Sequence, residues 1–191
     1  MSVSHRNTET TGLTHTLLAF SSRSVRNTTI SLSPSTSGLN SPTPLYVVET
    51  PEKSGDPPNT IYRISSNGKK EHVATLIWRT FRKDLIVIGG ETKELRQVLP
   101  KNGSPLRYTM PTLTGDWTWK TLFDSPELFN SSGKSVAKYD KIFRNEKKNK
   151  PPAEMVVAPE AMGVLDMGFC IRQSATSAAT LARSDVSLGK N

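Results

Sequence analysis

The chain has 191 residues, of which 35% are hydrophobic and 22% are charged, with a formal net charge of +8 and a mean hydropathy of −0.44. This length fits one domain, and no apolar run reaches the roughly 20 residues that a membrane-spanning helix needs. The single cysteine, Cys170, excludes an intramolecular disulfide framework, and three histidines leave little for a zinc site. We therefore expect a soluble protein without a metal or cofactor.

The first half of the chain contains short alternating runs of β-branched and aromatic residues, a pattern that predicts strands. These runs lie at residues 14–20, 27–32, 45–50, 60–64 and 72–78. Asn67-Gly68 predicts a type I′ hairpin turn before the last run, because both residues tolerate a positive φ. Residues 33–44, rich in Ser and Pro, are predicted to form a mobile loop, because proline gives no donor to a strand ladder.

The second half continues the pattern. Strands are predicted at residues 84–88, 115–120, 135–139, 141–144 and 154–157. Gly89-Gly90 predicts another hairpin turn, residues 94–99 fit either a short strand or one helical turn, and Trp117 and Trp119 should share one face of their strand. The apolar run at residues 163–173 closes the fold as a strand or as a buried helix.

The sequence thus predicts an all-β, mainly antiparallel fold of ten or more short strands, arranged as a barrel or a sandwich. We expect a disordered N-terminus at residues 1–13, a single β domain at residues 14–173 and a polar tail at residues 174–191.

The order of these motifs resembles a family of uncharacterised basidiomycete fungal proteins related to the tubby C-terminal, LURP-one and phospholipid-scramblase barrels. The resemblance rests on residues 17–20, 26–30, 45–51, 60–63, 73–78, 115–120 and 156–166. It implies about a dozen strands round a central apolar C-terminal helix, and it carries no catalytic signature. The run from Gly163 to Ile171 is shorter than that helix and is interrupted by glycine.

The basic excess lies in the middle of the chain, where residues 60–150 hold eighteen Lys/Arg and nine Asp/Glu. Cations gathered on one sheet edge attract phosphates, and arginine holds them bidentately. The candidate residues for binding anionic phospholipid headgroups lie on or beside the two central hairpins: Arg63, Lys69, Lys70, Arg79, Arg82 and Lys83. The same residues also fit a solvated surface whose charges keep the sheet edges from pairing with other chains. Because side chains alternate along a strand, these cations should lie on different faces, which favours this second interpretation.

Two other functions remain open from the sequence. The basic run at residues 144–150 fits a nucleic-acid contact through Lys147, Lys148 and Lys150, or a nuclear address. Cys170 would be a nucleophile only beside a base, and its place between Phe169 and Ile171 fits a core residue better. No phosphate-binding glycine loop, nucleophile elbow or metalloprotease motif occurs.

We therefore predict a non-enzymatic binding or interaction module whose partner is an anionic membrane lipid or another protein. Residues 1–16 are polar and give no export signal, so an intracellular, cytoplasmic location is expected, with peripheral membrane or nuclear placement as alternatives. The sequons at Asn27, Asn102 and Asn130 are then expected to stay unmodified.

Overall fold

The computed structural model describes residues 15–22, 26–33, 41–52, 57–79, 82–101, 107–122, 125–140 and 153–166. The first seven strands are β1 (Thr16–Phe20), β2 (Thr28–Leu32), β3 (Thr43–Glu49), β4 (Asn59–Ile64), β5 (Lys70–Ile77), β6 (Leu85–Ile88) and β7 (Glu91–Glu94). After the short helix α2 (Leu95–Val98) come β8 (Arg107–Thr112), β9 (Gly115–Leu122), β10 (Ser125–Phe129), β11 (Ser135–Asp140), β12 (Glu154–Val157) and the 3-10 helix η1 (Pro159–Val164).

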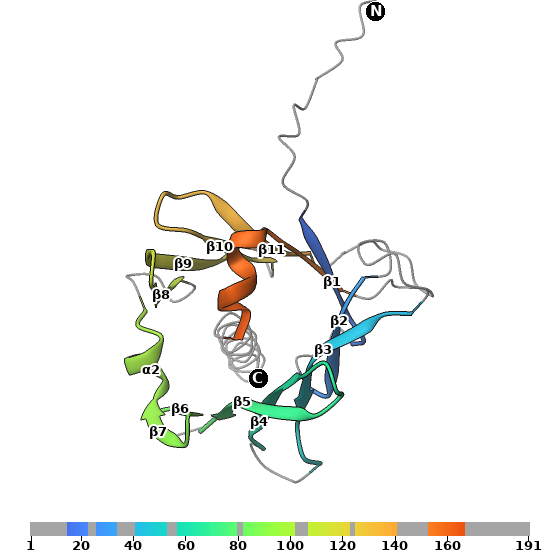
Figure 1. Cartoon of the computed structure of the whole chain (residues 1–191). Coiled ribbons are helices and arrows are strands. Elements are labelled where there is room, and N and C mark those ends of the chain that lie inside the picture. Colours follow the sequence, from blue (N-terminus) through green and yellow to red (C-terminus); the bar gives the residue numbers. More distant parts are fainter. Residues whose placement is uncertain are drawn as a thin grey trace, which may run out of the picture.

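All twelve strands belong to one antiparallel sheet with the order β7-β6-β5-β4-β3-β2-β1-β12-β11-β10-β9-β8. Apart from the contact between β1 and β12, every neighbour in the sheet is also a neighbour in the chain. The sheet curls round η1, and its two edges, β7 and β8, are not paired with each other (Figure 1). The predicted all-β antiparallel fold is confirmed; the barrel is not closed.

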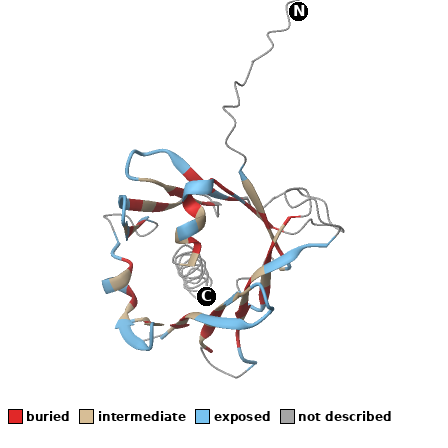
Figure 2. Ribbon diagram, in the orientation of Figure 1, coloured by how far each residue is buried: buried red, intermediate tan, exposed pale blue. Residues whose placement is uncertain are grey.

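The core lies on the inner face of the curled sheet and along η1 (Figure 2). Alternate residues of most strands enter it, so Trp117 and Trp119 are both buried on one face of β9, as predicted. The ring of Phe20 meets Tyr139 edge-on at 5.3 Å between centroids. Ala161 and Leu165, on and just after η1, are also buried.

Two turns show how glycine sets the hairpins. Gly89 and Gly90 have φ values of 59° and 80° and join Ile88 to its partner Glu91 in a two-residue turn, which confirms the predicted hairpin turn. The predicted hairpin at Asn67-Gly68 is confirmed, because β4 pairs with β5 on either side of it, but the predicted type I′ turn is wrong. Ser65 N donates to Lys69 O at 3.0 Å, which makes a three-residue loop, and within it only Gly68 has a positive φ.

The reason for this loop lies in the Asn67 side chain. Its Oδ1 accepts hydrogen bonds from Lys69 N at 3.0 Å and from Ser65 Oγ at 2.6 Å, which fixes Asn67 with the ordinary negative φ. The left-handed position then falls on Gly68 alone.

Other boundaries refine the predictions. β3 begins at Thr43, because a register shift between Ile30 and Ser31 allows Pro44 into the ladder. Of the two alternatives at residues 94–99, Glu94 ends β7 and a helical turn follows. The run at 163–173 begins as helix through Asp166. The predicted N-terminal segment, the strand at 141–144, most of the Ser/Pro loop and the polar tail lie outside the described residues.

Candidate functional site

The alternation of strand directions decides where the charged connections lie. In this sheet every odd-numbered strand ends on the same side, so the described residues 78–79, 82–84 and 95–101, which follow β5 and β7, lie at one end, which we call the seam end. The turns at residues 65–69, 89–90, 113–114 and 130–134 follow even-numbered strands and lie at the opposite end, the far end.

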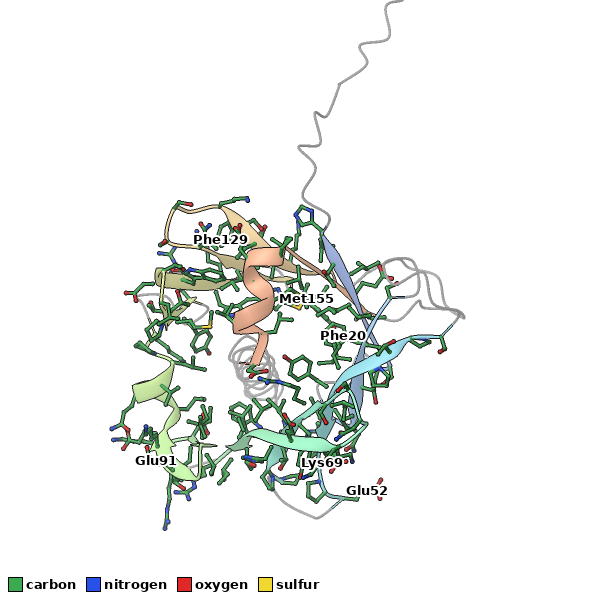
Figure 3. All side chains as sticks on the ribbon, viewed as in Figure 1. Phe20, Glu52, Lys69, Glu91, Phe129 and Met155 are labelled. Carbon is green, nitrogen blue, oxygen red and sulfur yellow. The ribbon has the colours of Figure 1, made fainter. Side chains whose placement is uncertain are left out.

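The six candidate residues from the sequence therefore separate into three groups. Arg79, Arg82 and Lys83 lie at the seam end and are exposed. Lys69 and Lys70 lie at the far end, where Figure 3 labels Lys69. Arg63 belongs to neither end, because it lies within β4.

Arg63 belongs to the inner face of the sheet. It is the cross-strand partner of the buried Tyr46, and partners directly opposite each other share a face. Lys70 instead forms an ion pair with Glu49 and lies 5.6 Å from the ring centroid of Tyr62, whose strand position next to Arg63 puts it on the outer face. The structure therefore does not bring the six residues into one patch.

The seam end gains cations that the sequence reasoning did not single out. Arg96 lies on α2, Lys101 follows it, and Arg107 begins the edge strand β8; all three are exposed. With the three predicted residues they form what we call the basic seam: Arg79, Arg82, Lys83, Arg96, Lys101 and Arg107.

Contacts beside the edge strand β7 fix the part of the basic seam that lies on the β5–β6 connection and α2. Lys83 Nζ lies 2.8 Å from Glu94 Oε1, and Leu95 N donates to Asp84 O at 2.9 Å, so the β5–β6 connection is fixed to α2. Asp84 Oδ1 also accepts from the backbone N–H of Arg79 at 3.1 Å. These bonds set the positions from which the cations project.

Tyr108 connects β8 to the same cluster. Lys101 forms an isolated bridge with Tyr108, and its Nζ lies 5.8 Å from the centroid of the Tyr108 ring. Burial raises the pKa of Tyr108; the charge of Asp84 adds to this rise and that of Arg96 opposes it. Groups from the β5–β6 connection and from α2 thus lie within electrostatic reach of a phenol on β8.

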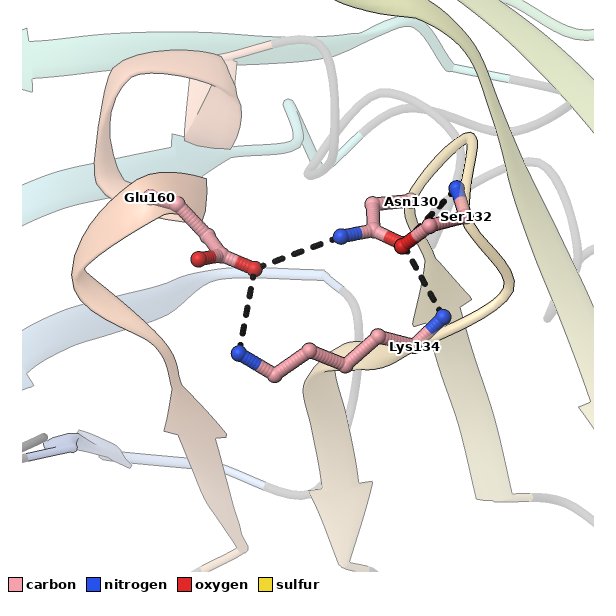
Figure 4. A network of polar contacts seen from close by, with 4 residues as sticks. All are labelled: Asn130, Ser132, Lys134 and Glu160. Carbon is pink, nitrogen blue, oxygen red and sulfur yellow. Dashed lines mark hydrogen bonds and ion pairs between the residues drawn. The ribbon is translucent and has the colours of Figure 1, made fainter. Parts of the chain in front are cut away.

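The far end has a different electrostatic character. Lys134 Nζ lies 3.6 Å from Glu160 Oε1, and Asn130 Nδ2 donates to the same oxygen at 3.4 Å (Figure 4). Glu91, which begins the edge strand β7 at this end, pairs with Lys93 at 2.7 Å. Two cations at this end, Lys70 and Lys134, are therefore paired with acids. In the described part of the basic seam the only acids are Asp84 and Glu94.

The other candidates fall outside the described residues: the basic run at 144–150 with Lys147, Lys148 and Lys150, and Cys170. His72 is exposed on β5 and its Nε2 lies 2.9 Å from Thr75 Oγ1. Among the residues that the structure describes, no three His, Cys, Asp or Glu side chains cluster as a metal site would require, and no helix has the length and apolarity to cross a membrane.

Comparison with protein families gives one match. A family model described as a family of unknown function (DUF6593) matches residues 23–171, most of the chain. No curated protein and no solved structure matches the chain. The resemblance to the tubby, LURP-one and scramblase barrels therefore stays a prediction.

Proposed function

Because the chain belongs to the DUF6593 family of unknown function, we propose its role from the site itself: a non-enzymatic binding module that recognises anionic lipid headgroups through the basic seam. The observation that carries the proposal is the imbalance of charge at the seam. Among the described residues, six exposed cations lie there with two acids, and both acids are already engaged.

The residue types suit phosphate groups. Four of the six are arginines, whose planar guanidinium donates two parallel hydrogen bonds to one phosphate, while Lys83 and Lys101 act as point charges. Arg79, Arg96 and Arg107 form no ion pair within the described part of the chain. Their guanidinium groups are thus available to an external anion.

The location of the seam also suits a flat anionic surface. A lysine or arginine close to an anionic membrane contributes about 1 kcal/mol of attraction. Cations at one end of the curled sheet can approach a membrane together, whereas cations distributed round its outer face cannot. Several such contributions are enough for reversible binding without a membrane-spanning segment.

The proposal is tested with vesicles of three compositions: phosphatidylcholine alone, phosphatidylcholine with phosphatidylserine, and phosphatidylcholine with a phosphoinositide. Sedimentation at two salt concentrations gives the bound fraction. We expect binding to the phosphoinositide vesicles that survives physiological salt and exceeds binding to phosphatidylserine at equal surface charge. Failure to bind either anionic vesicle would contradict the proposal.

Nucleic acid enters the same experiment as a competitor. Single-stranded and duplex DNA are added at matched phosphate concentration. If DNA displaces the protein from phosphoinositide vesicles as well as soluble headgroup does, the seam is a general polyanion surface and the lipid function is wrong. A steep fall of DNA affinity with salt would then indicate the nucleic-acid alternative.

A further inference from the structure

A second anion contact lies on the inner face, away from the basic seam. Tyr46 on β3 and Arg63 on β4 are cross-strand partners, and both bond to Asp166, which follows η1. The Tyr46 hydroxyl donates to Asp166 Oδ1 at 2.7 Å, and the Arg63 guanidinium forms an ion pair with Asp166 Oδ2. Two strands thus supply one donor to each oxygen of a single carboxylate.

We propose that Arg63 and Tyr46 form a carboxylate-binding site on the inner face of the sheet, which the chain fills with its own Asp166. The site takes a planar carboxylate because its two donors address two different oxygens. It is separate from the basic seam, since Arg63 is on the inner face and is already neutralised.

The donors are fixed by the sheet rather than by their ligand. Tyr46 is 7% exposed, its neighbours Val48 and Ile61 on the same face are buried, and the β3–β4 register places Arg63 directly opposite it. Burial raises the pKa of Tyr46, while the Arg63 charge opposes the rise. The phenol therefore stays a neutral donor at physiological pH.

The segment that carries Asp166 is held by contacts other than its carboxylate. Ala161 and Leu165 are buried, Ala158 N donates to Val136 O at 2.8 Å, and Glu160 contacts both Asn130 and Lys134 (Figure 4). Removal of the Asp166 carboxylate should therefore leave η1 in place and vacate the site. This makes replacement by a free carboxylate measurable.

The test is chemical rescue of Asp166→Ala. The readout is the thermal midpoint of unfolding, measured in sodium formate and in sodium chloride at equal ionic strength. We expect the variant to melt below the parent protein and formate to recover at least half of the difference, with no such gain in chloride. If the alanine variant does not fold, its refolding from urea in formate and in chloride provides the reading: formate should restore folding and chloride should not.

Two controls isolate the site. The double variant Asp166→Ala/Arg63→Gln lacks one of the two donors and should gain nothing from formate. Asp116→Ala removes an exposed aspartate at the far end and should respond equally to both salts. Equal responses to formate and chloride in all variants, or a formate gain that persists without Arg63, would overturn the proposal, whatever the vesicle experiments show.

Discussion

Lys83 on the β5–β6 connection and Glu94 at the end of β7 lie 2.8 Å apart, Nζ to Oε1, beside the open edge of the sheet. Lys83 is 71% exposed, so solvent screens this pair and it contributes at most about 1 kcal/mol to stability. The pair matters more for the basic seam, because the negative charge of Glu94 lowers the positive electrostatic potential there.

Removing that acid should strengthen the proposed binding. We expect Glu94→Gln to bind phosphoinositide vesicles more tightly, by about 1 kcal/mol, because it frees Lys83 and keeps a carbonyl acceptor beside α2. Sedimentation measures the change. Glu91→Gln is the matched control, because it also breaks a lysine pair, with Lys93, but removes an acid at the far-end start of β7. Equal gains in both variants would show that only net charge matters.

Two glycines should respond oppositely to alanine. Gly90 has a φ of 80° and open space where an alanine methyl group would lie, so Gly90→Ala costs about 1–2 kcal/mol through backbone strain alone. Gly163 lies in η1 with an ordinary φ and open space, so Gly163→Ala should stabilise the protein by about 0.4–1 kcal/mol. Urea unfolding measures the free energy of unfolding of both variants. If Gly163→Ala loses as much stability as Gly90→Ala, the positive φ of Gly90 is not the cause of its cost.

Trp119 is a fully buried side chain whose indole N–H has no partner among the described residues. Trp119→Ala should cost about 3–5 kcal/mol, because it leaves a large cavity in the core. Trp119→Phe should cost clearly less, since it keeps a ring and removes an unsatisfied donor. Denaturant unfolding gives both values. A phenylalanine variant as unstable as the alanine variant would indicate that the N–H is bonded in solution.

Stability should fall at alkaline pH. Burial raises the pKa of Tyr46 and Tyr108 above the ordinary value of 10.0, so the folded protein holds these protons more tightly than the unfolded chain does. Their contribution is complete below about pH 10 and is lost as pH rises through the raised values. Urea midpoints from pH 8 to 11 should decline less steeply in Tyr46→Phe; an unchanged decline would contradict this origin.

Much of the fold could be predicted from local pattern. Alternation placed Trp117 and Trp119 on one buried face, and Gly89-Gly90 marked a hairpin, because strand period and turn conformation depend on neighbouring residues. The hairpin at Asn67-Gly68 was also predicted, but its turn type was wrong, because the hydrogen bonds to the Asn67 side chain favour a negative φ there and residue type alone does not reveal these bonds.

The site could be predicted only in part, because it depends on the ends of strands. Arg79, Arg82 and Lys83 were found among the cations beside the two central hairpins, whereas Arg96, Lys101 and Arg107 are spread from α2 to the start of β8 and were missed. The sequence did contain a signal for them. In an antiparallel meander alternate connections share an end of the sheet, so counting the predicted strands places the cations after β5 and those after β7 at the same end. The contact of Arg63 with Asp166 had no signal, since 103 residues separate them.

The central claim is that the basic seam, rather than net charge, binds anionic headgroups. We would compare two charge-matched triple variants on phosphoinositide vesicles: Arg79→Gln/Arg96→Gln/Arg107→Gln at the seam, and Lys69→Gln/Lys70→Gln/Lys134→Gln at the far end. The account predicts that the seam triple loses most of its affinity and that the far-end triple stays within about twofold of the parent. Equal losses, or a larger loss at the far end, would contradict it.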